Sequence, residues 1–504
     1  MHKERNKEEM RIIKETAAFS GANYFAQGLL MIRGFIIASV LGPALYGIWT
    51  IYRTFLSSAH FLSLGTTSAM VRQVPLEEGR GNHAAREKMQ QATFAWNVLS
   101  CGVVSVILLV LSFLCRDTDR RIEFILAACA FFLNAFKIFM PFKFNSERKI
   151  MEMSRFNILY AIMNTVFGLI LLFSYKINGL LVALIITNVI LMVWMRVRGE
   201  FSLALNFDFT MIKGLMNIGF PIMVLYVAFF LMAHIDQFVI YFMLGKSMTG
   251  YYGLAAFISQ IVHFIPYAIA TVLMPRMMHK LGRTGETTAI EEYFTKPIML
   301  LSGFLPIVFG LIFINIDSII FYCLPKYIPS LTVLRILLVG LFFTSLLKVP
   351  MDILIAFNKQ AKLLYVMIVL LAIGTIVDIV MVSCGYGIVG VAAATSVIFY
   401  AASLLTNAYV LRSFGKSWKL FGLALLRIHV PVAYVAIGLL YIMRFTMDGR
   451  IIITDVVRTI FFIIYIVPLI YYVNRKIRII EKIGQLLSSN IWRTEPNSRQ
   501  ESIE

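Results

Sequence analysis

The sequence predicts an all-α polytopic membrane protein with about 14 transmembrane helices. Hydrophobic residues make up 59% of the 504-residue chain and charged residues only 14%, whereas soluble domains average about 45–50% apolar and about 25% charged residues. The apolar residues gather in runs of about 20, the length that a helix needs to cross a bilayer. Fourteen such runs with short connections fill the chain, so no room remains for a soluble catalytic domain.

The predicted spans follow one another along the chain, with the basic residues mainly in the loops between them. A charged stretch from His2 to Lys14 precedes the first apolar run, but no small-residue cleavage site follows that run, so it is a full span rather than a signal peptide. The predicted spans, in order, are Phe19 to Leu41, Ile48 to Val71, Thr93 to Cys115, Ile122 to Phe142, Phe156 to Tyr175, Gly179 to Met195, Ile218 to Leu244, Tyr251 to His279, Pro297 to Ile316, Leu331 to Phe357, Leu363 to Cys384, Ile388 to Leu411, Gly422 to Met443 and Ile452 to Tyr472.

The distribution of positive charge predicts that both termini are cytoplasmic. Loops that stay on the cytoplasmic side of a membrane carry an excess of Lys and Arg. Of the 46 Lys and Arg residues, 31 lie in the two tails and the alternate loops on their side, 8 lie in the other loops and 7 lie within spans. We therefore expect an even number of spans and a multi-pass protein of the plasma membrane.

Two span junctions repeat weakly. Span 1 runs into span 2 through residues 41–47 (LGPALYG), and span 7 runs into span 8 through residues 244–251 (LGKSMTGY). The repeat predicts two parallel six-helix lobes related by a pseudo-twofold axis along the membrane normal, an architecture that suits alternating access around a central cavity. The predicted domains are an N-lobe of spans 1–6 (1–210), a C-lobe of spans 7–12 (211–412), spans 13 and 14 (413–475) and a cytoplasmic tail (476–504).

Arg33 and Arg53 are candidate substrate-binding residues, because an ionised side chain within a span is costly and therefore a functional candidate. At 1.5 Å per residue they lie roughly 12 and 8 Å from the outer ends of spans 1 and 2, so their guanidinium groups can meet at one level. Guanidinium groups bind diphosphate oxygens bidentately. The alternative is that both side chains extend to the outer headgroups. Asn23 and Gln27, one turn apart on span 1, either hydrogen-bond a sugar or make contacts between helices.

Asp236, Asp378 and Thr395 form a second candidate site. They fall roughly 10–14 Å from the predicted outer surface on spans 7, 11 and 12. Two carboxylates and a hydroxyl would hold a small hard cation or a proton. The alternative is two isolated aspartates hydrogen-bonded to neighbouring helices.

We predict structural roles for the other charged residues within spans. Lys348 and Asp352 are four residues apart in span 10 and are expected to pair on one helix face. Lys137, Arg335, Arg427 and Arg458 lie within reach of a membrane interface, and we expect three of these four to extend to it.

Further motifs give the chain a family resemblance. These are residues 250–255 (GYYGLA), residues 387–395 (GIVGVAAAT) and the pattern Gln73-x-Pro75 before a cytoplasmic loop, in addition to the two junctions. Over nearly its whole length the chain resembles the Wzx-type and lipid II flippases of the multidrug/oligosaccharidyl-lipid/polysaccharide exporter superfamily. The resemblance implies a V-shaped bundle of two lobes that moves a polyprenyl-diphosphate-linked saccharide from the cytoplasmic to the outer leaflet.

The same resemblance implies residues for both candidate sites. Flippases of this group carry essential arginines in their first two helices, which Arg33 and Arg53 match. Lipid II flippases have a sodium site made by aspartates on helices 7 and 11 with a valine carbonyl and a threonine on helix 12; the matching residues are Asp236, Asp378, Val391 and Thr395. The family's asparagine one turn before the helix-11 aspartate falls at Gly374, so sodium, protons and a substitute ligand at Thr375 all stay open.

We therefore expect a lipid-linked oligosaccharide flippase of a prokaryotic plasma membrane rather than an enzyme. The chain has no GxxxxGK[ST] loop for nucleotide phosphates, so a cation gradient or the membrane potential would drive transport. No cofactor is expected apart from Na⁺ or H⁺ as the coupling ion. The expected partners are the polyprenyl-diphosphate-linked saccharide and the lipid bilayer, with a polysaccharide polymerase and glycosyltransferases as further candidates. Nucleic acid is not expected despite the net charge of +19, because the basic residues lie in loops between spans.

Two other functions are alternatives. The first is a drug or organic-cation exporter of the same superfamily, against which the two arginines argue because a cationic drug favours carboxylates. The second is a multispan glycan polymerase or ligase, which generally needs a large outer loop for catalysis. The longest predicted outer loop here, Asp317 to Ser330, is short.

Overall fold

The computed structural model describes residues 2–202, 204–260, 290–357, 359–415, 418–446 and 451–477, together with a few isolated positions between 261 and 289. This part of the chain is helical and contains no strand. Its α-helices are α1 (His2–Ser58), α2 (Thr66–Gly79), α3 (His83–Leu114), α4 (Thr118–Ser146), α5 (Ile150–Val197), α6 (Phe209–Leu244), α7 (Lys246–Gln260), α9 (Glu292–Cys323), α10 (Ser330–Ser345), α11 (Lys348–Ala356), α12 (Gln360–Ser383), α13 (Gly387–Ser413), α14 (Trp418–Ile442) and α15 (Ile451–Ile477). Two short 3-10 helices are η1 (Ala59–Ser63) and η4 (Pro325–Tyr327).

The predicted fold class is confirmed. Among the described residues, 11 helical segments are long and apolar enough to cross a membrane. The 14 predicted spans map onto fewer segments because spans 1 and 2 share the long helix α1, spans 5 and 6 share α5, and only the first part of span 8, in α7, lies among the continuously described residues. Each of the two shared helices has a kink with non-helical φ/ψ, at Gly42 in α1 and at Lys176 in α5, and the chain changes direction there.

The predicted end of span 2 at Val71 is wrong. Helix α1 ends at Ser58, and η1 then leads to Leu64 and Gly65, whose positive φ values of 46° and 85° interrupt the helix. Gly65 also touches Gly219 of α6, because a Cβ on Gly65 would lie 2.2 Å from the Gly219 carbonyl carbon. The break therefore comes from a close approach of two backbones, which only glycine allows.

Span 10, predicted from Leu331 to Phe357, is confirmed as a candidate membrane span over Ser330–Ala356, but Leu346 and Leu347 interrupt its helix between α10 and α11. Pro350 in the first turn of α11 has no N–H to donate to the carbonyl of Leu346, which favours a break at this point. Of span 8, the part up to Gln260 lies in α7, and the rest of the prediction, to His279, lies outside the described residues.

Gly42 and Gly245 lie at the two repeated junctions and adopt similar backbone geometry. Their φ and ψ values are 68° and 172° at Gly42, and 85° and −177° at Gly245. Positive φ with extended ψ is essentially restricted to glycine. The weak sequence repeat therefore reflects one backbone turn used twice, and the division into lobes 1–210 and 211–412 stays a prediction.

The two turns pack against each other. A Cβ on Gly47 would lie 1.9 Å from the carbonyl oxygen of Lys246, and a Cβ on Gly250 would lie 1.9 Å from that of Pro43. The backbones of α1 and α7 therefore touch where only glycine fits. This contact fixes the part of α1 beyond its kink to the first turns of α7.

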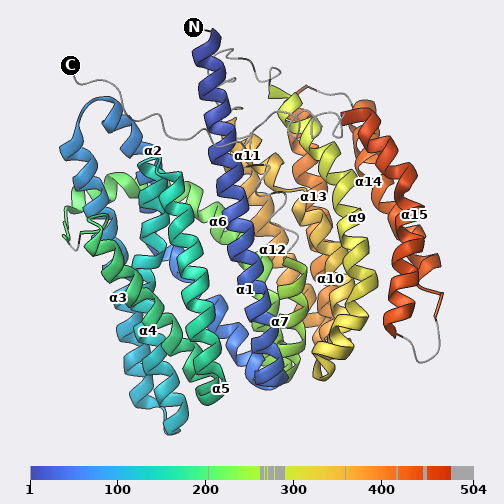
Figure 1. Cartoon of the computed structure of the whole chain (residues 1–504), viewed down its shortest axis with the longest axis horizontal. Coiled ribbons are helices and arrows are strands. Elements are labelled where there is room, and N and C mark those ends of the chain that lie inside the picture. The colour runs from blue at the N-terminus through green and yellow to red at the C-terminus, as the bar shows by residue number, and fades with distance from the viewer. Residues whose placement is uncertain are drawn as a thin grey trace, which may run out of the picture.

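Helix α1 lies between two groups of helices (Figure 1). It packs along α5 on one side and along α7 on the other. Helices α2 to α5 pack together in one group, whereas α7, α10, α12 and α13 form successive contacts in the other. Helix α6 connects the groups, since it contacts α2 and α3 as well as α12, and α14 and α15 cover α9 at the far edge.

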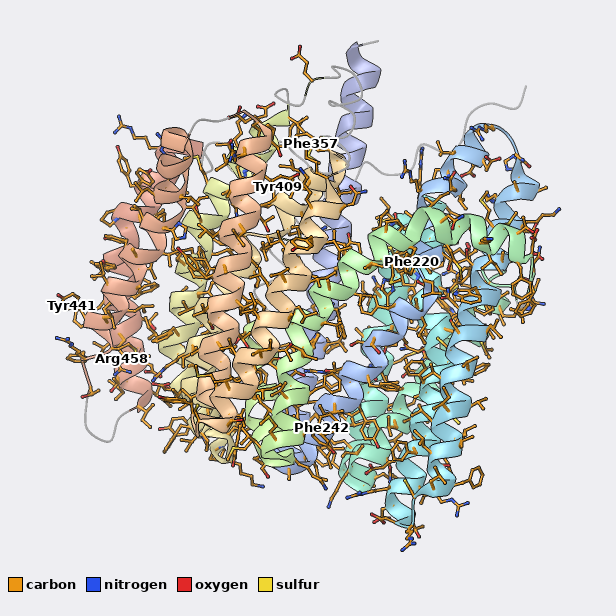
Figure 2. The ribbon with its side chains drawn as sticks, turned by 180° about the vertical axis from the view of Figure 1, so that it is seen from behind. Phe220, Phe242, Phe357, Tyr409, Tyr441 and Arg458 are labelled. Atoms are coloured by element: carbon orange, nitrogen blue, oxygen red, sulfur yellow. The ribbon has the colours of Figure 1, made fainter. Side chains whose placement is uncertain are left out.

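The surface of the bundle is apolar. Large hydrophobic side chains are exposed along α3, α5, α12, α14 and α15, and Phe242 and Tyr441, 80% and 69% exposed, project outward in Figure 2. A soluble monomer rarely exposes apolar area on this scale. The surface instead suits contact with lipid chains, as expected for a multi-pass membrane protein.

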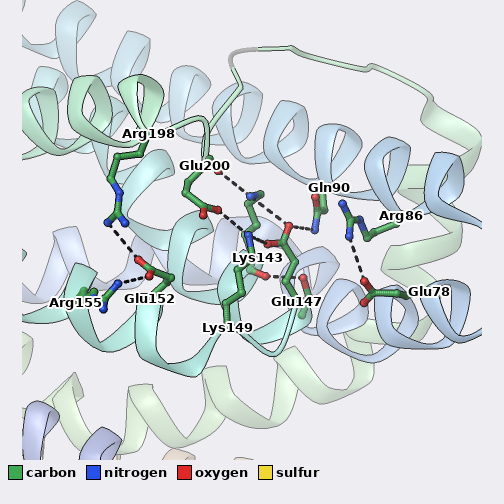
Figure 3. A network of polar contacts seen from close by, with 11 residues as sticks. Glu78, Arg86, Gln90, Lys143, Glu147, Lys149, Glu152, Arg155, Arg198 and Glu200 are labelled. Atoms are coloured by element: carbon green, nitrogen blue, oxygen red, sulfur yellow. Dashed lines mark hydrogen bonds and ion pairs between the residues drawn. The ribbon is translucent and has the colours of Figure 1, made fainter. Parts of the chain in front are cut away.

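Ion pairs join the ends of α3, α4 and α5 on the side that we predict to be cytoplasmic (Figure 3). Glu147 accepts a hydrogen bond from Gln90 Nε2 at 2.9 Å. Its carboxylate oxygens lie 3.2 and 3.1 Å from the Nζ atoms of Lys143 and Lys149. Lys149 also contacts Glu200 at 2.8 Å. Burial raises the pKa of Glu147, but the lysines and Gln90 outweigh burial and hold that pKa below its ordinary value.

Glu147→Gln is expected to lower the apparent unfolding temperature of the purified protein by a few degrees, because two lysines lose their shared carboxylate. Hydrogen bonds to charged groups typically contribute about 1.5–3 kcal/mol. A lowered pKa stabilises the fold above the ordinary glutamate value of about 4.3, and this contribution is lost as the pH falls through the lowered pKa. The difference from wild type should therefore be largest near neutral pH and disappear in acid.

Thermal unfolding in detergent, followed by tryptophan fluorescence across pH, measures this difference. The matched control is Glu292→Gln, which breaks an exposed pair with Lys296 and should change the unfolding temperature little. An equal loss in both variants would contradict a stabilising role for the Glu147 network.

Candidate functional site

Arg33 lies on α1 with its guanidinium group inside the protein. The residue is 7% exposed, and neither Nε nor Nη2 has a hydrogen-bond partner among the described residues. Gly168 of α5 makes room for it, since a Cβ there would approach Nε to 2.7 Å. A buried guanidinium with two unpaired donors is an uncompensated charge. This position is suited to binding an anion, and it differs from that of an arginine extended to lipid headgroups.

Arg53 lies on α1 beyond the kink and faces the same region. Its Cζ atom lies 5.1 Å from the ring centroid of Phe257 of α7, a cation–π contact. The same ring packs against Gly34, the residue after Arg33 on α1, because a Cβ on Gly34 would lie 2.3 Å from Phe257 Cζ. The charges of Arg33 and Arg53 are close enough to repel each other. The structure therefore brings the two arginines predicted from the sequence into one region.

Asn23 and Gln27 lie nearer the start of α1. Asn157 Nδ2 of α5 donates a hydrogen bond to Asn23 Oδ1 at 3.1 Å, so Asn23 makes a contact between helices in this conformation. Gln27 is half-buried. A role for either residue toward a sugar stays a prediction.

Lys137, Tyr160 and Asn164 extend this polar region and were not predicted to belong to it. Lys137 Nζ of α4 lies 4.9 Å from the ring centroid of Tyr160. Tyr160 Oη accepts a hydrogen bond from Asn164 Nδ2 at 3.3 Å. Asn157, Tyr160, Asn164 and Gly168 recur at spacings of three and four, so they share one face of α5. That spacing is the sequence signal by which the region could have been found.

Asp236 and Thr395 meet at a cavity of about 280 Å³ between α6, α7, α10 and α13. Asp236 Oδ2 accepts a short hydrogen bond from the hydroxyl of Tyr252, and Oδ1 accepts one from the backbone N–H of Gln237 at 2.7 Å. The hydroxyl oxygen of Tyr252 lies 3.5 Å from Thr395 Oγ1. Asp236 and Thr395 are predicted from the sequence to lie together, whereas Tyr252 between them is not.

Asp378 is buried on α12, and its Oδ1 atom has no hydrogen-bond partner among the described residues. Its carboxylate is close enough to that of Asp236 for their charges to interact. Val391 and Thr395 are buried one turn apart on α13. Burying like charges together without a cation is costly. Two carboxylates and a hydroxyl are ligands of the kind that a small cation takes, and a cation site that also includes the Val391 carbonyl stays a prediction.

The position of the missing family asparagine is apolar. A Cβ on Gly374 would face Ile398 at 3.3 Å. Thr375 Oγ1 donates its hydrogen to the carbonyl of Leu371 at 2.9 Å, within its own helix. Whether Thr375 serves as a substitute ligand stays a prediction.

Gln237 connects the region around Arg33 and Arg53 (the arginine region) with the region around Asp236 and Asp378 (the carboxylate region). It follows Asp236 on α6 and is fully buried. Its Oε1 accepts a hydrogen bond from Oγ1 of Thr54 at 3.2 Å, and its Nε2 lies 3.3 Å from His234 Nδ1. Because Thr54 follows Arg53 on α1, neighbours of the two candidate sites are directly hydrogen-bonded. The sequence alone gave no signal for this contact.

Three other charged residues within spans are paired. Lys348 Nζ contacts Asp352 Oδ1 at 2.7 Å, which confirms that predicted pair. Arg335 and Arg458 do not extend to an interface as expected. Arg335 Nη2 donates to both oxygens of Asp317 at 2.6 and 2.5 Å, and Arg458 Nη1 lies 3.3 Å from an oxygen of Asp455. Their acidic partners lie in α9 and α15, so both pairs are structural.

Residues 12–280, more than half of the chain, match the family described as "Polysaccharide biosynthesis protein". The chain belongs to this family. It is also 23% identical over 341 residues to a Shigella flexneri protein named "Putative O-antigen transporter", an alignment that covers 64% of this chain and 80% of that protein. The family expected from the sequence motifs is therefore confirmed.

Solved structures of transporters share the fold. The lipid II flippase MurJ in an inward closed conformation superposes with a TM-score of 0.65 at 16% identity, over 90% of this chain and 99% of that chain. An inward-facing multidrug resistance MATE family transporter of the MOP superfamily superposes with a TM-score of 0.64 at 14% identity, over 77% and 94% of the two chains. At these identities the likeness concerns the fold.

Proposed function

We propose that this membrane protein flips a polyprenyl-diphosphate-linked oligosaccharide from the cytoplasmic to the outer leaflet of the plasma membrane, for cell-surface polysaccharide synthesis. One observation carries the proposal: Arg33 and Arg53 interact electrostatically within membrane-spanning helices, with no carboxylate paired to either among the described residues. A diphosphate supplies the charge and the paired oxygens that two guanidinium groups need. The matching family is described as a polysaccharide biosynthesis protein, and one relative is named a putative O-antigen transporter. Both names support a substrate that carries a saccharide.

We further propose that a cation gradient or the membrane potential drives the transport by alternating access. Asp236 and Asp378 form a separate buried acidic pair on α6 and α12. A cation held there would bias one access state if it bound the two states with different affinity. The Thr54–Gln237 hydrogen bond gives this site a direct connection to the helix of Arg53.

The alternative functions are less well supported. A cationic drug would be repelled by Arg33 and Arg53, although MATE transporters share the fold. A glycan polymerase or ligase generally needs a large outer loop. The predicted loop from Asp317 to Ser330 is largely helical, since α9 continues to Cys323 and η4 precedes α10.

The proposal is tested in cells that make the lipid-linked saccharide but lack this protein. We expect the saccharide to accumulate with its sugar facing the cytoplasm, and expression of the protein to make that sugar accessible to an external lectin or glycosidase. Complementation that leaves sugar exposure unchanged would contradict the proposal. Extrusion of a cationic dye by the same cells would instead favour the drug exporter.

A further inference from the structure

Tyr252 occupies the contact that a cation at the carboxylate site would make. The residue is completely buried on α7, and its hydroxyl donates to Asp236 Oδ2 while its oxygen lies 3.5 Å from Thr395 Oγ1. The other oxygen of Asp236 already accepts the backbone N–H of Gln237. A cation that approaches Asp236 and Thr395 therefore meets the hydroxyl hydrogen of Tyr252 between them.

We propose that the Tyr252 hydroxyl competes with an alkali cation for Asp236 and Thr395, so that entry of the cation breaks the Tyr252–Asp236 hydrogen bond. This inference rests on the proposed function, because it concerns the coupling site of that transporter. A hydroxyl hydrogen and a small cation satisfy the same oxygen lone pairs. The hydroxyl hydrogen lies against the Oδ2 atom of Asp236, so a cation that shared this oxygen would lie next to a positively polarised hydrogen.

The negative charge of Asp236 and Asp378 favours exchange of the Tyr252 hydroxyl hydrogen for a cation. The Oδ1 atom of Asp378 is buried without a hydrogen-bond partner, its carboxylate interacts electrostatically with Asp236, and no Lys or Arg forms an ion pair with either carboxylate in the described part of the chain. The neutral Tyr252 hydroxyl satisfies one carboxylate oxygen but leaves the net negative charge in place. An alkali cation offsets one unit of that charge, and the adjoining cavity of about 280 Å³ has room for it.

Release of Tyr252 would change how α7 is held. The Tyr252–Asp236 bond ties α7 to α6, whereas the opposite attachment of α7, to α1, does not depend on it. That attachment includes Gly250 against Pro43, and Gly253, where a Cβ would lie 2.6 Å from Thr50 Oγ1. Breaking the hydrogen bond therefore removes one polar tie between α7 and α6, which remain joined at Gly245, while α7 stays packed against the part of α1 that carries Arg53. Cation entry would in this way reach the arginine region through α7.

The direction in which one substitution changes the Na⁺ affinity tests the proposal. Tyr252→Phe keeps the buried ring and removes only the hydroxyl. If the hydroxyl competes with the cation, the variant should bind Na⁺ more tightly, by roughly 10-fold or more for a hydrogen bond to a charged group. If the hydroxyl is instead a ligand, affinity should fall. The readout is the Na⁺-dependent rise of the unfolding temperature of the full-length protein, with choline chloride keeping the ionic strength constant.

Tyr327→Phe is the matched control, because it removes an equally buried hydroxyl that donates to the carbonyl of Ala38, away from the carboxylates. We expect its Na⁺ affinity to equal that of wild type. Weaker or unchanged affinity in Tyr252→Phe, or no effect of Na⁺ on the wild type, would overturn the proposal. These outcomes concern ion binding alone, whereas failure of the proposed function would appear as absent saccharide export by the wild type.

A second measurement avoids any packing defect in the variant. Fluorotyrosine incorporated at position 252 of the otherwise unaltered chain reports the environment of this hydroxyl by fluorine NMR. We expect its resonance to move on addition of Na⁺, with the midpoint seen in the thermal titration. A resonance that saturating Na⁺ leaves in place would overturn the exchange.

Discussion

Replacing both Arg33 and Arg53 with alanine is expected to abolish saccharide export while the protein remains inserted and folded. Each guanidinium group would lose its hydrogen bonds to the diphosphate, and a hydrogen bond to a charged group contributes about 1.5–3 kcal/mol. Each single alanine variant should therefore lose roughly 10- to 100-fold in productive binding, and the double variant should be inactive. The fold should tolerate the changes, because neither arginine holds an acidic partner among the described residues. Complementation of a strain that lacks the flippase measures the effect.

Two further variants separate geometry from charge. Lysine at either position should rescue export poorly, since it keeps the charge but loses the bidentate donor geometry. Gly168→Ala leaves both arginines in place but puts a Cβ 2.7 Å from Arg33 Nε, so the guanidinium must shift. The matched control Gly102→Ala meets nothing closer than 3.7 Å and should export normally.

Arg427→Ala serves as the charge control, because Arg427 is an exposed arginine of α14. We expect this variant to keep wild-type export. Full activity of the double Arg33, Arg53 variant would rule out an anion-binding role for the pair.

The positions of most helix breaks could be predicted from the sequence, because they depend on local backbone chemistry. The repeated junctions at Gly42 and Gly245 need glycine for their positive φ, and both were found as motifs. The break at Leu64 and Gly65 could not be found in this way. It depends on contact with Gly219 on another helix, and a lone glycine in an apolar run gives no such information.

The depth of a candidate residue in the membrane could also be predicted, but the direction in which its side chain points could not. The fixed rise of a helix placed Asp236 and Thr395 at one level, and the structure brings them together at one cavity. Which neighbours share that level depends on how each helix is rotated about its axis, and this rotation is set by packing against other helices. Tyr252 was therefore missed, although it belongs to a motif that the sequence analysis identified.

Polar residues illustrate the same limit. Asn23 was assigned either to a sugar or to a helix contact, and only the position of Asn157 on α5 decides which it makes in this conformation. Arg335 and Arg458 were expected at an interface because both lie within reach of one. The partner of Arg335, Asp317, lies on another helix and could not be found from the sequence, whereas Asp455 lies three residues before Arg458 on the same helix, a spacing that could have been recognised.

Asp236→Asn and Asp378→Asn are expected to uncouple transport from its driving gradient while saccharide binding remains measurable. Each change removes one charge from a buried pair of carboxylates that share a cation in the proposed mechanism. Removing one member of a buried charge interaction costs about 3–5 kcal/mol, so cation affinity should fall by more than about 100-fold. The effect is opposite in sign to that of Tyr252→Phe, because the asparagine variants remove ligands whereas the phenylalanine variant removes a competitor.

Proteoliposomes under imposed sodium, proton or potential gradients measure the coupling directly. Wild-type transport should respond to the coupling gradient, and both asparagine variants should show a slow rate that no gradient changes. With Gly374 in place of the family's asparagine, the sodium response should be weaker or less selective than the family resemblance implies, and a proton response would identify the other ion. Asp208→Asn is the matched control, because Asp208 caps the start of α6 at an exposed position and asparagine caps a helix equally well. If transport by Asp236→Asn and Asp378→Asn responds to the gradients as it does in the wild type and in this control, the two carboxylates do not share the coupling ion. Another ionisable group must then bind that ion.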